Sequence, residues 1–473
     1  MKSLTFPYGV GFRSLESETR APAPLRIEGA LPAWLQGMLL RTGPAKFEVG
    51  DRTYNHWFDG LAMLHRFAFA KGAVTYASRF LEGNAFNAAE RTNKISYAEF
   101  ATDPCRTLFG RVAAWFDPKF TDNCCVNVMD YGGKIVAFTE TMLPIRFEPD
   151  TLATLGVLAY DKALSGQVST AHAHYDVSRK RHYNYVVSFG LHSVYRLIAV
   201  SDSGAQELVA EIPVDRPSYM HSFAMTEHNL VLVEFPIVVS ALELKFSGKP
   251  FIQNYRWLPE RGLKFHIVEK DSGKVTTNAH SDPCFAFHHV NAYEGANGLA
   301  IDMVAYDDAS IIDQLYLARL RAGTPITATG TLTRFHAPLN GDAVTRETLA
   351  PIAIELPRIN YEAHAGRPYR YVWGAGIETE GDFLDSIVKI DLGLRRMARW
   401  YRKGLYPGEP VFVAAPGAMA EDEGVLLSIV LDVEKDRSLL LVLDAANLQE
   451  LARAEAPHPI PFHFHGNYFA GAN

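Results

Sequence analysis

The sequence predicts an all-β fold, and two observations favour a propeller within that class. Short strand–turn–strand units recur along the 473 residues, with one helical exception. Such repetition is typical of sandwiches, barrels and propellers, and the length favours a propeller. The second observation is an aromatic-flanked histidine, His465, close to the C-terminus. The last strand of a closed ring would bring this residue to the centre, beside every earlier part of the chain.

The same ring makes a single domain the expected organisation. Length alone suggests two or three domains. However, no Pro/Gly/Ser-rich linker divides the chain, so we expect one domain over residues 1–473.

In chain order, residues 1–35 form a lead-in, and the strands that follow come in pairs. Glycine and aspartate between paired strands supply the backbone angles of tight hairpin turns. The expected strands are residues 37–44, 63–69, 74–76, 195–200, 207–214, 264–269, 274–277, 425–433 and 438–443. The expected turns are residues 71–72, 201–204, 271–273 and 434–437.

Residues 103–120 are the helical exception. Their large apolar residues recur at helical spacing and predict an amphipathic helix with one apolar face. Two interpretations stay open: the helix packs on the β ring, or it dips into a membrane surface. The apolar residues are Leu108, Phe109, Val112, Trp115 and Phe116.

Composition excludes several classes of protein. A formal net charge of -7 offers no basic patch for nucleic acid. The four cysteines form no C-x-x-C pair, which favours a reducing compartment. We find neither a secretory signal pattern at the N-terminus nor the ~18 to 20 apolar residues of a membrane span. We therefore expect a cytoplasmic protein that can touch a membrane surface without crossing it.

Four histidines are candidate metal ligands, because histidine binds Zn, Cu, Fe and Ni. Each lies among apolar or small residues, and a closed ring would bring them to one axis. Their spacing matches no local metal motif, and a histidine on an apolar strand is often a hydrogen-bonded core residue. The four are His172, His221, His288 and His465.

Three acids among apolar neighbours are candidate partners of these histidines. A ligating imidazole usually donates its second ring nitrogen to a carboxylate or carbonyl. A lone buried charge would be costly, although an acid at a strand edge can simply be solvated. The three are Glu140, Glu355 and Glu409.

The ordered motifs closely resemble the carotenoid cleavage oxygenase family, in particular the branch of the animal carotenoid oxygenases and the retinoid isomerase of the retinal pigment epithelium. The matching stretches cover nearly the whole chain: residues 54–60, 103–105, 121–124, 139–141, 217–219, 287–289, 359–361, 408–410 and 464–466.

This resemblance implies a seven-bladed propeller with Fe(II) on its axis and a cap of helices and loops over a substrate tunnel. The iron ligands would be His172, His221, His288 and His465, chosen over the neighbouring His174 and His289. Glu140, Glu355 and Glu409 would hold these histidines.

The reaction implied by the resemblance is oxidative cleavage of a polyene double bond to two carbonyl products, with dioxygen as co-substrate. Four histidines on one side of an octahedral iron leave open positions for dioxygen. Thr139 is expected to border the oxygen position. The protein would otherwise supply a dry cavity and align the target bond.

Three functions compete. The first is cleavage of a carotenoid or apocarotenoid, including central cleavage to retinal, which the animal-like motifs favour. The second is cleavage of a stilbene, for which related enzymes use a Tyr and a Lys. Lys134 matches the lysine, but Phe100 stands at the tyrosine position. The third is retinyl-ester isomerisation or, from a different class, a metal-stabilised propeller that only binds a partner.

Overall fold

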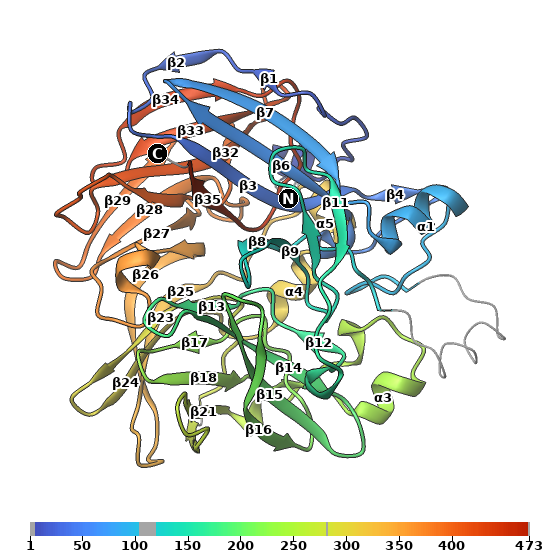
Figure 1. Cartoon of the computed structure of the whole chain (residues 1–473), viewed down its shortest axis with the longest axis vertical. Helices are drawn as coiled ribbons and strands as arrows, with labels where there is room; N and C mark the ends of the chain where they lie inside the picture. The colour runs from blue at the N-terminus through green and yellow to red at the C-terminus, as the bar shows by residue number, and fades with distance from the viewer. Residues whose placement is uncertain (1–4, 104–119, 281, 472–473) are drawn as a thin grey trace.

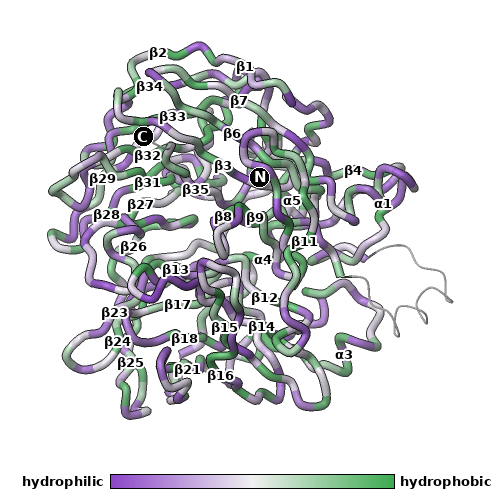
Figure 2. Tube along the Cα trace, viewed as in Figure 1, coloured by the Kyte–Doolittle hydropathy of each residue, from purple (hydrophilic) through white to green (hydrophobic). Residues whose placement is uncertain are grey.

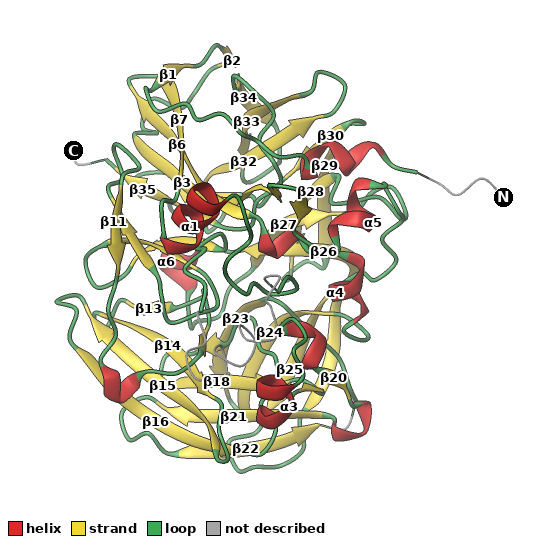
Figure 3. Ribbon diagram, turned by 90° about the vertical axis from the view of Figure 1, so that its right-hand side faces the viewer, coloured by secondary structure: helices red, strands yellow, loops and turns green. Residues whose placement is uncertain are grey.

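The computed structural model describes residues 5–103, 120–280 and 282–471. In these ranges the protein is mostly β, and the sheets follow one another around the middle of the molecule (Figure 1). The few short helices lie in connections between strands (Figure 3). Pairings between the named strands of the described residues are all antiparallel, as repeated hairpins require.

Six sheets of four or more strands make up most of the described chain. The first contains β1 (Ala23–Pro24), β7 (Ala73–Phe80), β6 (Leu61–Ala70), β3 (Gly37–Lys46) and β35 (Gly466–Ala470). The second contains β11 (Thr154–Val157), β10 (Ile145–Phe147), β9 (Ile135–Phe138) and β8 (Asn127–Asp130). The third contains β12 (Val168–Ser169), β13 (His174–Asp176), β14 (Arg181–Ser188), β15 (Ser193–Ser201) and β16 (Gln206–Val214).

The fourth sheet contains β17 (Ala224–Met225), β18 (Asn229–Glu234), β21 (Leu263–Glu269) and β22 (Val275–His280). The fifth contains β23 (His289–Gly295), β24 (Gly298–Ala305), β25 (Thr331–Ala337), β26 (Thr345–Arg358), β27 (Tyr371–Gly376), β28 (Ser386–Asp391) and β29 (Arg396–Tyr401). The sixth contains β2 (Ile27–Gly29), β34 (Glu450–Glu455), β33 (Arg437–Asp444), β32 (Gly424–Asp432), β30 (Leu405–Pro407) and β31 (Val411–Ala414).

Short elements complete the described chain. Two strand pairs are β4 (Glu48–Val49) with β5 (Arg52–Thr53), and β19 (Ile237–Val238) with β20 (Arg256–Trp257). The α-helices are α1 (Asn84–Thr92), α3 (Ala241–Phe246), α4 (Ser310–Gln314), α5 (Leu317–Arg321) and α6 (Tyr361–His364). The 3-10 helices are η1 (Pro7–Phe12), η2 (Trp57–Asp59), η3 (Lys162–Leu164), η4 (Ile252–Asn254) and η5 (Pro259–Arg261).

The hairpins expected from the sequence are confirmed, each with ends shifted by a few residues. β6 and β7, β15 and β16, β21 and β22, and β32 and β33 pair around the four expected turns. Gly204 and Gly273 have φ of 84° and 67°, which a side chain would strain. The lead-in is more structured than expected, because β1 pairs with β7 and β2 with β34.

The first and last long segments of the described chain share a sheet. β35 pairs with β3 in the register Gly37↔Ala470 to Arg41↔Gly466. This pairing places His465, which directly precedes β35, beside the N-terminal sheet. The expectation that the C-terminal segment lies against early parts of the chain is therefore confirmed.

Burial follows the strand pattern. All six residues of β18 are buried, whereas β16 alternates between buried and exposed residues toward its end. One large cluster of buried residues extends from Tyr8 to Phe464. Figure 2 shows hydrophobic residues along the inner strands and hydrophilic ones along many outer loops.

The amphipathic helix expected over residues 103–120 lies almost wholly outside the described residues, which omit 104–119. It stays a prediction. Among the helices of the described ranges, none has the length and apolar character needed to cross a bilayer.

Candidate metal centre

The four candidate ligands come from four different sheets. His172 lies between β12 and β13, His221 lies just ahead of β17, and His288 and His465 directly precede β23 and β35. β17, β23 and β35 are edge strands of their sheets. A histidine at the start of an edge strand is therefore the feature that these sheets share.

Hydrogen bonds from side chains of the same and of neighbouring sheets fix the loops that carry His172 and His221. Asn127 of β8 donates through Nδ2 to the carbonyl of Ala171, at 3.0 Å, and Asn184 of β14 donates to the carbonyl of Thr170, at 3.1 Å. The Tyr185 hydroxyl donates to the carbonyl of Met220. The residues adjoining His172 and His221 thus have fixed backbones.

The four imidazoles converge on one point. One nitrogen of each lies within 4.8 Å of one nitrogen of every other. Nε2 of His172 is 2.9 Å from Nε2 of His221, and Nε2 of His288 is 3.0 Å from Nε2 of His465. Since neutral imidazole nitrogens that carry lone pairs repel at such distances, the arrangement is compatible with a metal ion between them.

Three of the histidines are anchored by the three predicted acids. Nδ1 of His221 is 2.7 Å from Glu140, Nδ1 of His288 is 2.5 Å from Glu355, and Nδ1 of His465 is 2.7 Å from Glu409. An Nδ1 proton donated to a carboxylate leaves the Nε2 lone pair directed at the common centre. For His172 we find no carboxylate partner among the described residues.

Each acid has further donors, and these differ in charge. The Tyr219 hydroxyl donates to Glu140 at 3.1 Å, and the Tyr306 hydroxyl donates to Glu355 at 2.8 Å. Glu409 instead forms ion pairs with Arg41, at 3.3 Å, and Arg358, at 2.9 Å. Two acids therefore have neutral partners, and the third lies between two cations.

Burial and neighbouring charges favour the neutral form of two of the imidazoles and the ionised form of two of the acids. Burial lowers the pKa of His465 to about 4 and that of His172 well below its ordinary value. Burial alone would raise the pKa of Glu409 and Glu355, but Arg358 and His465 for the first and His288 for the second hold it below the ordinary value. Neutral imidazole is the form that binds a metal.

The neighbouring histidines of the two doublets are engaged elsewhere. His174 contacts the Tyr361 hydroxyl through Nδ1, at 2.7 Å, and the carbonyl of Phe223 through Nε2, at 2.8 Å. Nδ1 of His289 lies 2.8 Å from the Ser222 hydroxyl. The geometry therefore agrees with the choice of His172 and His288 within the doublets.

A cavity of about 730 Å³ opens onto three of the four histidines, and most of its lining is apolar. Phe58, Phe287 and Phe464 pack on one another next to His221, with Phe58 and Phe464 5.0 Å apart between ring centres. Thr139 lines the cavity, as its expected place beside the oxygen position requires, and so does Phe100.

Lys134 requires a correction. It was a candidate tunnel residue, but it is exposed on the turn between β8 and β9 and is not among the described residues that line the cavity. The physical reason is local. Gly132 and Gly133, with φ of 61° and 69°, form a tight hairpin turn, which directs the next residue to solvent.

Sequence reasoning missed several residues of the site. Tyr219 was quoted within a family motif but was given no role, and Tyr306, Arg41 and Arg358 were not singled out. Glu99, which also lines the cavity, was overlooked although Phe100 was chosen. Acids and arginines among apolar neighbours would have been the signal for Glu99 and Arg41.

By fold and site, this is a mostly-β protein with an all-histidine centre, compatible with a metal, beside an apolar cavity. The family model described as "Retinal pigment epithelial membrane protein" matches residues 12–470. The chain belongs to this family, the carotenoid oxygenases.

Relatives of known name and structure are similar over nearly the full chain. The mitochondrial carotenoid-cleaving dioxygenase of Macaca fascicularis is 34% identical, over 94% of this chain and 91% of the relative. The carotenoid isomerooxygenase of Galleria mellonella is 35% identical, over 97% and 96%. The β,β-carotene 15,15'-dioxygenase of Rattus norvegicus is 33% identical, over 97% and 91%. A mutant of Synechocystis apocarotenoid oxygenase superposes with a TM-score of 0.88 at 26% identity, over 99% of this chain and 100% of that one.

Proposed function

We propose that the protein is an Fe(II)-dependent dioxygenase that cleaves a carbon–carbon double bond of a carotenoid or apocarotenoid into two carbonyl products. The observation that carries the proposal is the four-histidine centre, with three carboxylate anchors, at an apolar cavity. The names of relatives at 33 to 35% identity, which are carotenoid-cleaving and carotene dioxygenases and a carotenoid isomerooxygenase, support oxidative cleavage of a carotenoid.

The donor set fits Fe(II), which would be held by His172, His221, His288 and His465. When bound, the iron supplies the activation of dioxygen. Glu140, Glu355 and Glu409 orient three imidazoles and offset the charge of the metal. Phe58, Phe287 and Phe464 exclude water from this side of the cavity and align an apolar chain beside the histidines, while Thr139 borders the place of dioxygen.

We also propose that the fold is a seven-bladed propeller that forms one domain over residues 1–473. The sheet of β23 to β29 supports this number, because the 14-residue strand β26 pairs with β25 on one side and β27 on the other. Divided at β26, this sheet forms two blades, which bring the total to seven. The pairing of β35 with β3 would close the ring.

Stilbene cleavage loses its support. It requires a polar pair that holds a phenol, and here Lys134 is exposed and Phe100 has no hydroxyl. Sites built to bind a hydroxyl discriminate strongly against analogues that lack it. We therefore expect hydroxystilbenes to be poor substrates.

The test is an assay of iron-loaded protein with β-carotene, an apocarotenal and a hydroxystilbene under oxygen, with identification of the carbonyl products. We expect about one iron per chain and cleavage of at least one of the two polyenes. His221→Ala should release the iron and abolish cleavage, and Lys134→Met, the exposed control, should stay within a few-fold of wild type. Hydroxystilbene cleavage that collapses in Lys134→Met would overturn the carotenoid assignment.

We further propose peripheral membrane contact at the mouth of the cavity, in a protein of cytoplasmic location. Leu191, Leu242 and Phe246 are 88%, 58% and 54% exposed, and all three line the cavity beside Lys245 and Lys249. Exposed apolar residues next to lysines favour binding to anionic lipid. Fewer Leu242→Asp molecules than wild-type molecules should float with anionic liposomes. Equal flotation of the two folded proteins would exclude membrane contact at this mouth of the cavity. The segment 103–120 remains a second candidate.

A further inference from the structure

Glu99 is an acid in an apolar setting for which the iron centre gives no explanation. Its side chain lines the cavity and is only 6% exposed. It lies between Ala98, which bridges to Phe120, and Phe100, whose carbonyl accepts a hydrogen bond from the backbone of Ile252. Its backbone position is therefore fixed from two sides.

The carboxyl of Glu99 is hydrogen-bonded by side chains. The Thr121 hydroxyl donates to Oε1 at 2.7 Å, and the Asn123 side chain is the other hydrogen-bonding group that favours the ionised carboxyl. Among the described residues no lysine or arginine forms an ion pair with it, in contrast to Glu409. A carboxyl in the wall of an apolar cavity can accept or donate a further hydrogen bond when a ligand with a polar group enters.

The neighbouring acid Asp59 is a useful comparison, because hydrogen bonds from the protein satisfy its carboxylate completely. Asp59 accepts hydrogen bonds from the backbones of His56, at 3.1 Å, and Ala101, at 3.0 Å, and from the Thr102 hydroxyl, at 2.6 Å. These three donors occupy both of its oxygens. Glu99 lies in the same region, but among the described residues its carboxyl accepts only from side chains and from no backbone N–H, and it borders the cavity.

The surroundings of Glu99 favour the protonated form of its carboxyl. Burial raises the pKa of Glu99 well above its ordinary value, and the Thr121 hydrogen bond offsets this only in part, while Asp59 and Asp122 add to it. A neutral carboxyl carries an O–H donor as well as an acceptor. It can therefore donate to a carbonyl or hydroxyl oxygen inside an apolar cavity.

The position of Glu99 suits one end of a substrate that extends to the histidines. The ring of the adjoining Phe100 lies 5.1 Å from that of Phe58, which lies 6.5 Å from the ring of His221. Two ring contacts thus separate Glu99 from the metal centre along the cavity wall. A molecule held at Glu99 would present a bond several atoms from its end to the centre.

We propose that Glu99, oriented by Thr121, hydrogen-bonds the oxygen-bearing end group of the substrate, so that a polyene with an aldehyde or hydroxyl end binds in preference to a hydrocarbon carotenoid. This inference rests on the proposed function and adds the class of substrate that the site selects. A hydrocarbon would leave the Glu99 carboxyl buried beside apolar atoms without a further partner.

The test measures binding separately from cleavage. Iron-loaded protein without oxygen is titrated with an apocarotenal and with β-carotene, and the carbonyl stretch of the bound apocarotenal is recorded by Raman spectroscopy. In wild type we expect tighter binding of the aldehyde and a carbonyl stretch lowered by the hydrogen bond. Glu99→Leu should weaken aldehyde binding about tenfold, leave β-carotene binding unchanged or tighter, and return the stretch to its unbonded value.

Two further variants separate recognition from folding. Glu99→Gln keeps a donor and an acceptor of similar shape and should retain most of the preference for the aldehyde. Thr121→Val, which removes the orienting hydroxyl, should reduce the preference even if Glu99→Leu does not fold. An unchanged ratio of the two affinities and an unshifted stretch in folded Glu99→Leu or Thr121→Val would overturn the proposal. Absence of polyene binding by folded wild type would instead overturn the proposed function on which it rests.

Discussion

At the scale of single residues, the three acids that contact the histidines differ in the charge of their other partners. Each directs one imidazole, but Glu140 and Glu355 are completed by tyrosine hydroxyls, whereas Glu409 lies between Arg41 and Arg358. Loss of a carboxylate should therefore have different consequences at different positions. At Glu355 it mainly affects the metal, and at Glu409 it mainly affects folding.

Glu355→Gln should bind iron about 10 to 100-fold more weakly and stay folded, because the amide keeps the shape but neither fixes the Nδ1 proton of His288 nor offsets the metal charge. Competition with a chelator measures the affinity, and thermal unfolding checks the fold. Tyr306→Phe, which keeps the carboxylate but removes one of its three hydrogen-bond donors, is the milder control. Wild-type iron affinity in Glu355→Gln would show that this carboxylate does not act on the centre.

Glu409→Gln should destabilise the fold itself. Arg41 is fully buried, and burial lowers its pKa only to about 10, so it stays charged at neutral pH. Removal of its partner leaves a buried cation, which typically costs ~3 to 5 kcal/mol. Denaturant unfolding of iron-free protein measures this, with Glu140→Gln as the control, since its partners are His221 and the neutral Tyr219. Equal destabilisation by the two substitutions would contradict the argument.

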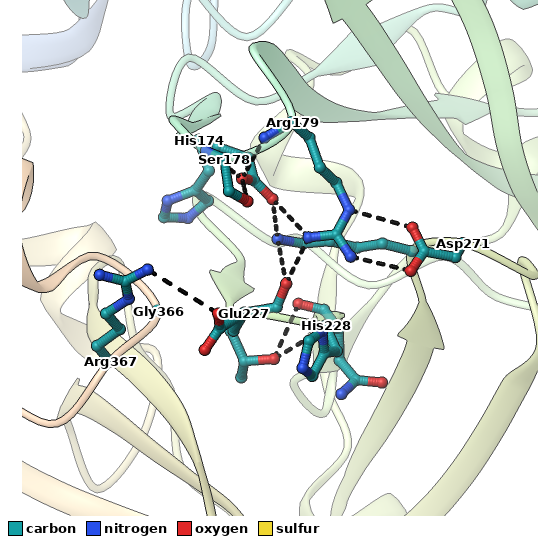
Figure 4. Close-up of polar contacts among 12 residues, drawn as sticks. His174, Ser178, Arg179, Glu227, His228, Asp271, Gly366 and Arg367 are labelled. Atoms are coloured by element: carbon teal, nitrogen blue, oxygen red, sulfur yellow. Dashed lines mark hydrogen bonds and ion pairs between the residues drawn. The ribbon is translucent and has the colours of Figure 1, made fainter.

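At the scale of elements, a cluster of polar contacts joins the hairpins of two neighbouring sheets. Lys270, in the turn between β21 and β22, forms an ion pair with Asp176 at the end of β13, at 2.7 Å. Arg179 binds Asp271 of the same turn through Nε and Nη2 and reaches Asp176 through Nη1, at 3.2 Å (Figure 4). Both cations also donate to the carbonyl of Glu227. This cluster holds the third and fourth sheets, which carry His172 and His221, in a fixed relation.

The cluster should make stability depend on pH in acid. Burial alone would raise the pKa of Asp176, but hydrogen bonds from Lys270 and Ser178 bring it to about 2. An unfolded aspartate has a pKa of roughly 3.9 and takes up its proton first, so the contribution is complete above about pH 5 and is lost as the pH falls toward 2. The difference in urea midpoint between wild type and Asp176→Asn should therefore shrink from pH 6 to pH 3. Asp150→Asn, at an exposed ion pair, should track wild type, and a constant difference for Asp176→Asn would exclude this role.

At the scale of the whole molecule, the sequence predicted what repeats locally and left open what distant segments share. Hairpins such as β15–β16 follow from glycine turns and alternating apolar residues, and the resemblance supplied the four histidines and three acids. Which acid faces which histidine could not be predicted, because Glu409 and His465 come from different sheets that only long-range folding brings together. The placement of Lys134 in the substrate tunnel was wrong for a local reason. The tight turn formed by Gly132 and Gly133 directs its side chain to solvent.

The last strand, β35, gives a test of how far the histidine centre depends on the pairing of β35 with β3. Removal of residues 467–473 keeps all four histidines and all three acids but deletes most of β35, whose partner is β3. It also removes Asn467, whose side-chain oxygen accepts a hydrogen bond from Arg358 at 3.2 Å. Without these contacts His465 would be the next-to-last residue, followed only by Gly466, and would lose the strand that fixes its backbone. We therefore expect iron content to fall well below one per chain and the unfolding transition to broaden.

Iron analysis and calorimetry of the truncated protein measure both effects, and Tyr468→Phe, which keeps the strand and loses one hydroxyl, is the control. A truncated protein that retains full iron and a sharp transition would mean that Glu409, Arg41 and the bond from Arg41 to the carbonyl of Phe464 hold His465 by themselves. The centre would then be assembled by local contacts of the site, and the pairing of β35 with β3 would matter only for stability. We expect the first result, because a ligand at the start of an edge strand is positioned by the strand that follows it.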